Sequence, residues 1–450
     1  MDLSNRSEAI FLFIGDIILF YVSLFFMLFI RYGSGLDGRL TMQHIIPFSI
    51  LFVLWVVVFF IAGLYEKHTL LLQKQLPQLL LNTLVINSII AVAFFYFVPA
   101  LKITPKINLF IYLFVSCLLL LLWRWHSYRL GTMAQKQNAV IIGSGRELAE
   151  ITNEVNQNPR YRFKFVATID TDKISGGFLE TELLSHVSAQ NVGLVAIDLK
   201  NAALAPVLPH LYTLLFSKVR FVDMHTVYED IFDRVPLSLL GYNWFLENIS
   251  AAFTKTTYDF LKRSMDIAAS AILGLLSLFL YPFVVAAIRL DDNGPVFVFQ
   301  ERVGRGNRTI RTIKFRTMAR DDAGLPELKA GNRVTRVGSV LRKTRIDELP
   351  QLLNVLRGEM SLIGPRPELP SLVEGYERDV PYYNIRHLIK PGLSGWAQLY
   401  HKTPPKVDAN ARATAVKLSY DLFYLKNRSL LLDLKIALKT LKVLLSRSGV

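Results

Sequence analysis

The chain has 450 residues, 52% of them hydrophobic, and a mean hydropathy of +0.34. Ordinary soluble domains are less apolar, so these values exclude a purely soluble globular protein and predict a membrane protein. The net charge is +15, and residues 258–450 carry +13 of it, with 31 Lys and Arg against 18 Asp and Glu. That part is expected to meet lipid headgroups, a phosphorylated substrate or nucleic acid, unless it is simply a solvated basic surface. The single cysteine, Cys117, excludes a disulfide framework and a thiol metal site.

Four long apolar stretches fill the first 130 residues, at 9–30, 45–65, 76–101 and 107–123. A bilayer core needs about 20 apolar residues of helix, so each stretch spans a membrane or nearly so. The N-terminus lacks the cationic start and the small-residue cleavage site of a secretory signal, so the first stretch is expected to stay as an anchor. Residues 1–135 are therefore predicted to form a four-helix transmembrane bundle.

Polar residues within these apolar stretches include Asp16, Asn82 and Asn87. A carboxylate at membrane depth, such as Asp16, is a functional hypothesis by default. For Asp16 we favour a helix–helix hydrogen bond or a water-facing position. Asn82 and Asn87 in the third stretch suggest a surface for a homodimer.

The next segment, 136–250, begins with "NAVIIGSGRELAEI", a β-branched run followed by a glycine pair and a helical pattern. Together with "FKFVATID", "VGLVAIDL" and "KVRFVDM", which are typical of buried parallel strands, it predicts a Rossmann-like α/β domain. Gly143 and Gly145 suit a phosphate-cradling turn, and Asp170 suits a ribose acceptor. The third glycine position is Leu148, so the fingerprint is incomplete and we favour a structural or docking domain without a ligand.

Residues 267–288 are uncharged but include Pro282, which predicts a bend because proline removes a backbone donor and clashes with the preceding turn. Two outcomes are open, a kinked span or a re-entrant hairpin over 259–290. Lys262 and Arg263 before the run suit lipid headgroups if the hairpin forms, which is the outcome we favour.

The C-terminal segment places Lys435, Lys439 and Lys442 on one helical face and leucines on the other. Such a basic amphipathic helix lies in a membrane interface or packs onto the domain core, and the sequence does not decide between the two.

Between residues 295 and 400 the pattern changes to short strands and turns rich in arginine. Arginine forks suit bidentate phosphate binding, and glycine and proline turns hold them in place, so a phosphate-handling site is implied. Motifs typical of nucleic-acid recognition are missing, and nucleic acid is not an expected partner. The candidate phosphate-binding residues are Arg302, Lys314, Arg316, Arg342, Lys343, Arg366 and Pro367.

The run "LRKTRIDELPQLLNVLRG" sets Asp347 and Glu348 among cations, with Asp347 expected to cap a helix. Free backbone donors at such a terminus attract phosphate oxygens. A carboxylate there is unexpected unless it reacts with the phosphate or shares a metal with it. One of the pair would attack phosphorus to form an acyl phosphate, while the other would hold Mg²⁺. Neighbouring cations, among them Arg345, are expected to keep both carboxylates ionised. The alternative for an isolated pair is a capping Asp followed by a solvated Glu.

The surrounding sequence argues against a simple capping role for Asp347 and Glu348, because six motifs follow one another in order over residues 262–445. They are "KRSMD", "GPVFVFQERVG", "IKFRTM", "LRKTRIDELPQLLNVLRGEMSLIGPRPELP", "KPGLSGWAQL" and "YDLFYLKNRSLLLDLKIALKT". This part resembles the bacterial polyprenyl-phosphate hexose-1-phosphate transferases, also called monotopic phosphoglycosyl transferases. The chain as a whole resembles the long form of that family, with a four-helix bundle and a Rossmann-like domain in front of the transferase domain.

The resemblance implies an α+β monotopic catalytic domain over 251–450, with a re-entrant membrane helix, on the cytoplasmic face of the bacterial inner membrane. It implies transfer of a sugar 1-phosphate from a UDP-sugar to undecaprenyl phosphate with release of UMP, at the start of capsule, O-antigen or exopolysaccharide synthesis. By match to the family's dyad, Asp347 would be the nucleophile and Glu348 the Mg²⁺ partner, and Arg366 would contact phosphate. The family's membrane helix usually breaks at Ser-Pro, whereas here Pro282 follows a tyrosine about a turn later, which leaves the shape of the hairpin open.

Two rival functions account for part of the sequence. A membrane-anchored NAD-dependent nucleotide-sugar dehydratase or epimerase needs a Tyr-x-x-x-Lys pair, and Tyr258 and Lys262 have that spacing, but no glycine fingerprint precedes them. A non-enzymatic scaffold for polysaccharide export explains the membrane helices but not the ordered arginine motifs. Which sugar is transferred cannot be deduced from the sequence.

Overall fold

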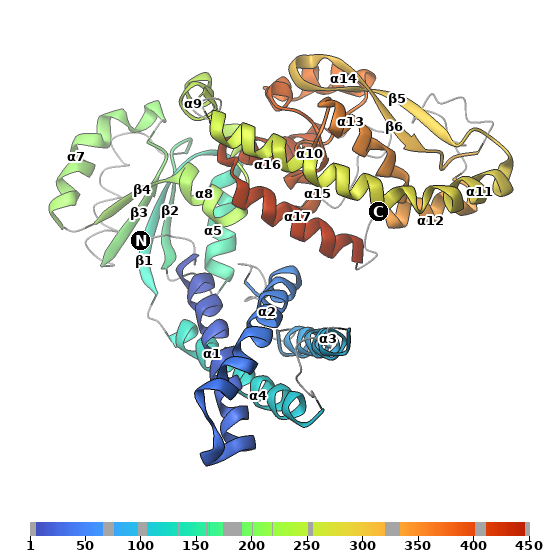
Figure 1. The fold of residues 1–450 in the computed structure, drawn as a ribbon. Coiled ribbons are helices and arrows are strands. Elements are labelled where there is room, and N and C mark those ends of the chain that lie inside the picture. The colour runs from blue at the N-terminus through green and yellow to red at the C-terminus, as the bar shows by residue number, and fades with distance from the viewer. Residues whose placement is uncertain are drawn as a thin grey trace. The chain divides into compact units, whose positions relative to one another are not determined.

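The computed structural model describes residues 6–65, 76–97, 106–133, 136–158, 161, 163–173, 191–199, 201–217, 219–250, 255–319, 334–400 and 411–445. They form two compact units, Met1–Ile231 and Phe232–Val450 (Figure 1). The boundary predicted at residue 250 differs from the observed one. The reason is that Trp244, Phe245 and Ile249 pack into the core of the second unit.

Within the described part of the chain, four helices are long and apolar enough to cross a membrane. Phe20, Trp55 and Tyr112 pack together at their centre, whereas outward side chains such as Phe29 and Phe110 are 67% and 72% exposed. An apolar exterior of this kind is stable where lipid covers it. The predicted bundle is confirmed, although residues 98–101 of its third stretch lie outside the described ranges. The helices are α1 (Arg6–Tyr32), α2 (Gly38–Ala62), α3 (Leu76–Phe97) and α4 (Lys106–Met133).

A buried ion pair joins the first and last of these helices. Asp16 of α1 is fully buried, pairs with Arg124 of α4 and accepts a hydrogen bond from the Tyr65 hydroxyl at 2.9 Å. Arg124 also donates to the Leu64 carbonyl oxygen at 3.1 Å. A charge far from water is costly unless it is paired, so this contact holds α1 and α4 in register. The expected helix–helix contact of Asp16 is confirmed.

The two asparagines of α3 do not share a surface. Asn87 is fully buried and Asn82 is exposed. Residues five apart on an α-helix lie on different faces, because each residue turns the helix by about 100°. The prediction that both form a dimer surface is therefore wrong for Asn87.

The rest of the first unit is an α/β domain. Four parallel strands, in the order β2-β1-β3-β4, bring their carboxyl ends to one edge, where Gly143 pairs with Asp170 and Ile197 with Asp223. The Rossmann-like prediction is confirmed. The elements are β1 (Gln137–Gly143), α5 (Gly145–Gln157), β2 (Phe163–Asp170), β3 (Val192–Ile197), η4 (Ala202–Val207), α7 (Leu208–Thr213), η5 (Leu214–Ser217), β4 (Arg220–Asp223) and α8 (Met224–Phe232).

The second unit is α+β, as predicted. An antiparallel hairpin, β5 (Phe297–Val303) with β6 (Thr309–Phe315), and a short parallel pair, β7 (Ser361–Ile363) with β8 (Gly392–Ser394), lie among helices. The helices and 3-10 turns are η6 (Leu237–Leu239), α9 (Tyr242–Asn248), η8 (Arg305–Asn307), α12 (Arg336–Thr344), η9 (Ile346–Gln351), α13 (Leu352–Arg357), α14 (Pro370–Asp379), η10 (Tyr383–Leu388), α15 (Trp396–Tyr400) and α16 (Ala411–Asn427).

Two further helices form a bent apolar pair, α10 (Thr256–Leu278) and α11 (Tyr281–Asp292), with a bend of 56° between them. Pro282 lies in the first turn of α11, where a missing backbone N–H costs nothing. The bend predicted near this proline is confirmed. It fits a broken span as well as a re-entrant hairpin, so the hairpin stays a prediction.

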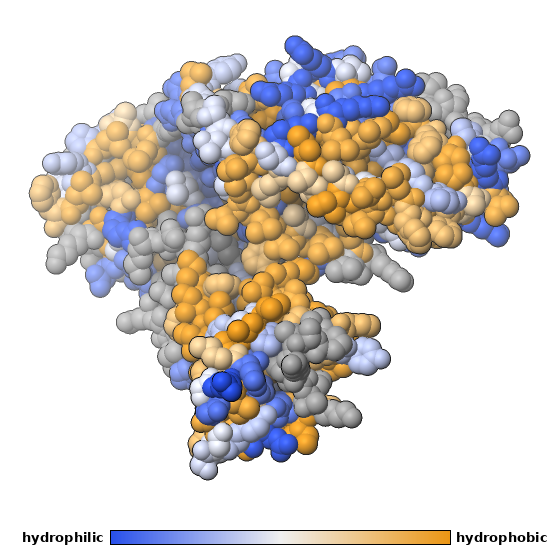
Figure 2. Space-filling model, in the orientation of Figure 1, coloured by the Kyte–Doolittle hydropathy of each residue, from blue (hydrophilic) through white to orange (hydrophobic). Residues whose placement is uncertain are grey.

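The last helix, α17 (Leu430–Leu445), packs its lysine face onto the domain core. Lys435 and Lys439 lie over the Trp396 ring, at 5.0 and 5.6 Å from its centre, while Leu431 is 80% exposed. The lysine stems pack onto the core, and several leucines, including Leu431 and Leu434, are exposed. Figure 2 shows hydrophobic surface over α10 and α17. An exposed apolar face of this extent is typical of a membrane or protein contact. Its members include Phe260, Ile272, Leu275, Phe279, Phe283, Leu290 and Leu434.

The pair in the bundle generates a first prediction. In Asp16→Leu the Arg124 guanidinium loses its buried counter-charge, so we expect the free energy of unfolding to fall by about 3–5 kcal/mol. The measurement is unfolding of the full chain in detergent micelles. Asp16→Leu combined with Arg124→Leu should recover most of the loss, and the control Arg39→Leu, at an exposed position, should change stability by less than about 0.5 kcal/mol. A single variant as mild as this control would contradict the prediction.

Candidate active site

One face of the β5–β6 hairpin carries polar side chains in a period of two. Gln300 and Arg302 lie two residues apart in β5, and Thr312 and Lys314 lie two residues apart in β6. Gln300 is directly opposite Thr312. Residues two apart in a strand point to the same side, so all four face one cavity. Arg302 is further held by a hydrogen bond to the Gln300 side-chain oxygen at 2.8 Å.

The acidic pair comes from a sharp junction between two helical segments. Helix α12 ends at Thr344, its C-cap Arg345 has a φ of +57° in the left-handed region, and the 3-10 helix η9 begins at Ile346. That conformation is costly for a residue with a side chain, so tertiary contacts must hold it. Asp347 lies in the first turn of η9 and is not a helix cap. The capping prediction is wrong because α12 turns directly into η9 and leaves no extended residue between them.

These segments and the loop at Arg366 enclose a cavity of about 240 Å³. Seven predicted site residues line it, and Arg345, Gln300, Thr312, Gln351, Gly392 and Leu393 complete it. Gln300 and Thr312 could have been predicted from the sequence, because each lies two positions from Arg302 or Lys314 in the same strand and so points to the same side. The seven are Arg302, Lys314, Arg342, Asp347, Glu348, Arg366 and Pro367.

Two predicted phosphate-binding residues do not line this cavity. Arg316 follows the end of β6, so the strand alternation no longer applies, and its buried guanidinium lies against Gly294. Lys343 is exposed on α12, whereas its neighbour Arg342 turns inward and donates to the Thr317 hydroxyl at 2.9 Å. Adjacent residues on a helix point about 100° apart, which separates the two side chains.

Glu348 is held by two arginines. Its Oε1 accepts from Arg366 Nη2 at 2.9 Å and from Arg345 Nη1 at 3.2 Å. Burial alone would raise the pKa of Glu348, but these two guanidinium groups outweigh it and lower that pKa. Glu348 therefore stays anionic.

Asp347 is in the opposite situation. It is 8% exposed, and within the described residues its Oδ1 has no hydrogen-bond partner. Burial, and then the charge of Glu348, raise the pKa of Asp347 to about 6, although Lys314 and Arg345 act against this shift. The expectation that the cations keep both carboxylates fully ionised is correct for Glu348 and only partly correct for Asp347.

Lys314 completes the electrostatics of the cavity. Burial, followed by the charges of Arg302 and Arg342, lowers the pKa of Lys314 to about 8. A cluster of like charges of this kind is poised for an anionic ligand, whose binding would remove the repulsion between the cations.

A buried network that the sequence did not predict supports the arginine turn. Arg386 is 2% exposed, lies 2.8 Å from Asp421 and donates to the Arg366 carbonyl oxygen at 3.0 Å. Glu368 pairs with Lys417 and lies 3.8 Å from Arg386. These charges fix the backbone that carries Arg366 into the cavity. Arg386 and Asp421 lie in arginine- and tyrosine-rich runs, but nothing in the sequence pairs them.

An apolar groove of about 640 Å³ shares Glu348 with the cavity of the acidic pair. Arg345 also lines both, and leucines of α10 and α17 line the groove. The groove thus borders the charged cavity through these two residues. Its apolar lining includes Leu273, Leu276, Leu280, Leu349, Leu352, Leu434, Leu441 and Leu444.

The predicted membrane-anchor residues make contacts within the second unit. Lys262 pairs with Asp433 at 2.9 Å, and Arg263 donates to the last carbonyls of α13, at Val355 and Leu356. They fasten α10 to the domain, and their contact with headgroups stays a prediction. The Tyr258 hydroxyl donates to the same Asp433 oxygen, so the Tyr-x-x-x-Lys spacing serves packing.

In the Rossmann-like domain the predicted nucleotide residues lie together but are already engaged. The space that a Cβ on Gly143 would take is filled by the Met224 sulfur, and Asp170 pairs with Lys173 at 3.0 Å. Gly145 has a positive φ of 81° at the start of α5, as a tight turn requires. The turn forms as predicted, with the Met224 sulfur packed against Gly143, the first of its two glycines.

Profiles of two known families match parts of the chain. The profile of the family described as "Bacterial sugar transferase" matches residues 257–447, and one described as "CoA-binding domain" matches residues 51–188. The chain belongs to the bacterial sugar transferase family, since it is 41% identical over 195 residues, 96% of the relative, to "Exopolysaccharide production protein PSS" of Rhizobium leguminosarum bv. phaseoli, covering 42% of this chain.

Two longer relatives carry names that state a reaction. One is a "UDP-N-acetylgalactosamine-undecaprenyl-phosphate N-acetylgalactosaminephosphotransferase" of Aeromonas hydrophila, 42% identical over 49% of this chain and 51% of the relative. The other is an "Undecaprenyl-phosphate glucose phosphotransferase" of Komagataeibacter xylinus, 33% identical over 68% of this chain and 58% of the relative. The alignments thus span a little more than half of each of these relatives.

Glu368 generates a prediction about stability and pH. Burial would raise its pKa, but Lys417 and Arg386 outweigh burial and hold the pKa of Glu368 at about 2. A carboxyl group with a depressed pKa stabilises the fold above its unfolded pKa of about 4.3, and this contribution is lost as the pH falls toward 2. We expect the free energy of unfolding of the wild type to fall by about 3 kcal/mol more over this range than that of Glu368→Gln.

The measurement is denaturant unfolding of the full chain between pH 5 and 2. The matched control is Glu374→Gln on α14, an exposed glutamate, which should keep the pH dependence of the wild type. Equal pH dependence in the wild type and in Glu368→Gln would contradict the prediction.

Proposed function

We propose that this protein transfers a sugar 1-phosphate from a UDP-sugar to undecaprenyl phosphate, giving undecaprenyl-diphosphate-sugar and UMP. The observation that carries the proposal is Asp347, a buried carboxylate with an unpartnered oxygen in a cavity lined by cations. Family membership and the names of the two longer relatives support it. The reaction would begin the synthesis of a capsule, an O-antigen or an exopolysaccharide.

Asp347 is the nucleophile. Its carboxylate oxygen attacks the sugar-linked phosphorus, the bond from that phosphorus to the bridging oxygen breaks, and UMP leaves with the electron pair. The raised pKa favours Asp347 over Glu348 for this role, because a more basic carboxylate is a stronger nucleophile and this one is still mostly ionised at neutral pH. Lys314, Arg302 and Arg366 neutralise charge on the phosphate oxygens.

The lipid acceptor completes the exchange. A phosphate oxygen of undecaprenyl phosphate attacks the same phosphorus, and the Asp347 carboxylate leaves unchanged. The apolar groove between α10 and α17 suits the polyprenyl chain, and its end at Arg345 brings the lipid phosphate to the acidic pair. The anomeric C–O bond is never broken, so the sugar configuration is retained. One diphosphate linkage replaces another, so UMP should readily reverse the reaction.

Mg²⁺ is the cofactor expected at this site. Mg²⁺ is usually bound by one or two carboxylates together with water and substrate phosphates, so an acidic pair in a phosphate-sized cavity fits it. Glu348 would hold the ion, because its two arginine contacts involve only Oε1 and keep it anionic. When bound, the ion supplies positive charge against the diphosphate.

The membrane arrangement follows from the substrates. Undecaprenyl phosphate presents its phosphate at headgroup depth, while a UDP-sugar is soluble and cytoplasmic. One active site must therefore lie at the cytoplasmic surface of the inner membrane. A re-entrant α10–α11 hairpin with the apolar face of α17 beside it would place the cavity there.

The deciding experiment is UMP release from UDP-sugars with the full chain in detergent or membranes. Asp347→Asn removes the nucleophile without changing its size, and we expect at least about 10³-fold loss of UMP release. Continued release of UMP by the wild type should require both undecaprenyl phosphate and Mg²⁺. A labelled donor should transfer its sugar phosphate to Asp347.

The matched control is Asp379→Asn, an exposed aspartate on α14, which should keep wild-type activity. Unchanged turnover in Asp347→Asn, or a product that forms only when both substrates are bound together, would overturn the covalent route. A panel of UDP-sugars in the same assay identifies the donor.

The pH dependence of kcat/KM provides a further prediction. The rate should rise with pH up to about 6, as Asp347 loses its proton, and fall above about 8, as Lys314 loses its charge. Lys314→Arg keeps its charge at high pH, so the alkaline fall should move upward while the acid limb stays. An acid limb near pH 4 would contradict the assignment of Asp347.

A further inference from the structure

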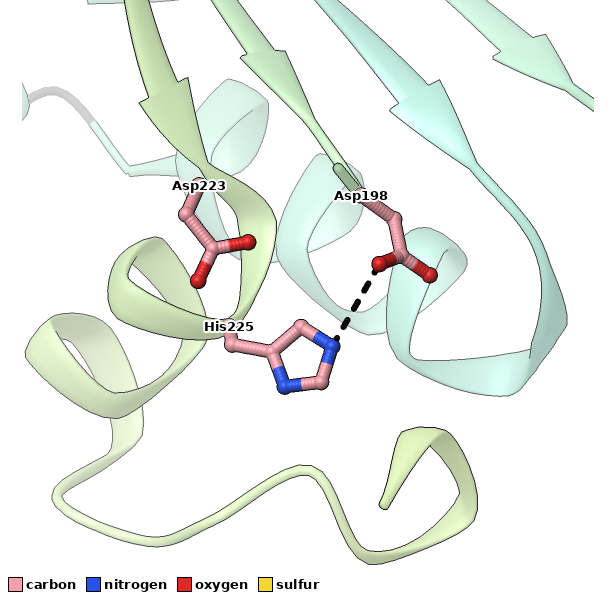
Figure 3. A group of neighbouring side chains, drawn as sticks. All are labelled: Asp198, Asp223 and His225. Atoms are coloured by element: carbon pink, nitrogen blue, oxygen red, sulfur yellow. Dashed lines mark ion pairs between the residues drawn. The ribbon is translucent and has the colours of Figure 1, made fainter. Parts of the chain in front are cut away.

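A second group of potential ligands lies in the Rossmann-like domain. Asp198 follows directly after β3, Asp223 ends β4, and His225 lies in the first turn of α8 (Figure 3). One ligand atom from each lies within 4.8 Å of the others. All three are at the carboxyl edge of the parallel sheet, where domains of this fold bind their ligands.

His225 is buried but unsatisfied. It is 3% exposed, and in the described part of the chain neither ring nitrogen has a hydrogen-bond partner. Its Nε2 points toward Asp198 Oδ1, but the 3.5 Å between them exceeds an ordinary hydrogen bond (Figure 3). The Asp223 Oδ1 atom is also buried without a hydrogen-bond partner among the described residues. Such groups cost free energy unless something binds them.

The geometry points to a divalent transition metal, such as Zn²⁺, held by Asp198, Asp223 and His225. Ligand bonds of about 2.0–2.1 Å in a tetrahedral site put ligand atoms about 3.4 Å apart, close to the Nε2–Oδ1 separation. An imidazole with two carboxylates suits Zn²⁺ better than Mg²⁺, which prefers oxygen ligands alone. Three protein ligands leave a coordination position for water or an anionic group such as a phosphate.

Packing against the neighbouring strand fixes the segment that carries two of the proposed ligands. Met224 lies between Asp223 and His225 in the chain, and its sulfur fills the space beside Gly143 at the end of β1. This contact holds Asp223 and His225 at the carboxyl edge of the sheet, beside Asp198.

The test is zinc binding by the full chain in detergent, freed of metal with a chelator and titrated with Zn²⁺ in equilibrium dialysis. We expect the wild type to retain about one Zn²⁺ per chain more than His225→Ala, or to bind at this site at least about tenfold more tightly. Cobalt replacing zinc should give a visible spectrum with nitrogen coordination in the wild type and lose that feature in His225→Ala.

Asp223→Asn serves as a second variant that keeps side-chain volume, with circular dichroism to show that each variant is folded. Asp172→Asn, an exposed carboxylate after β2 in the same domain, is the matched control and should bind zinc as the wild type does. Equal zinc binding in the wild type, His225→Ala and Asp223→Asn would overturn the proposal and leave a simple buried ion pair. Equal loss in Asp172→Asn would also overturn it, because the loss would then not depend on the three ligands.

Discussion

The second unit depends on the burial of one acidic group, Asp347, among cations. Burial and the charge of Glu348 raise the pKa of Asp347, and Lys314 and Arg345 lower it, with a resulting pKa of about 6. This balance requires each cation at a fixed distance. The left-handed Arg345, the polar face of the hairpin and the Arg386 network under Arg366 hold those positions. The raised pKa of Asp347 is therefore a product of the whole α+β domain and not of its local loop.

The excess of basic residues in the C-terminal part is largely used inside the domain. Lys435 and Lys439 pack over Trp396, Lys417 pairs with Glu368, and Arg386 is buried beside Asp421. The outward face of α10, α11 and α17 is instead apolar. The outer surface of these helices is thus hydrophobic, while positive charge is concentrated around the cavity that Arg302, Lys314 and Arg342 line.

The Rossmann-like domain has the fold of a nucleotide-binding domain but different side chains at its binding edge. Its strand order and tight glycine turn are those of a nucleotide-binding domain, and a CoA-binding profile matches part of it. The third glycine position of the fingerprint is nevertheless Leu148, and a His and two Asp residues gather at the carboxyl edge of the sheet. A shared fold does not carry a shared ligand, because the side chains at the edge decide what binds.

The sequence by itself determined the elements whose signal is local. Long apolar runs predicted the four membrane helices, β-branched runs predicted the parallel strands, and the spacing of cations around Asp347 and Glu348 indicated the acidic site. Only the tertiary structure decided which face of α17 is buried, that Arg316 and Lys343 lie outside the cavity, and that Arg386 meets Asp421. These outcomes depend on contacts between residues far apart in the chain, and periodicity within one segment carries no information about its partner.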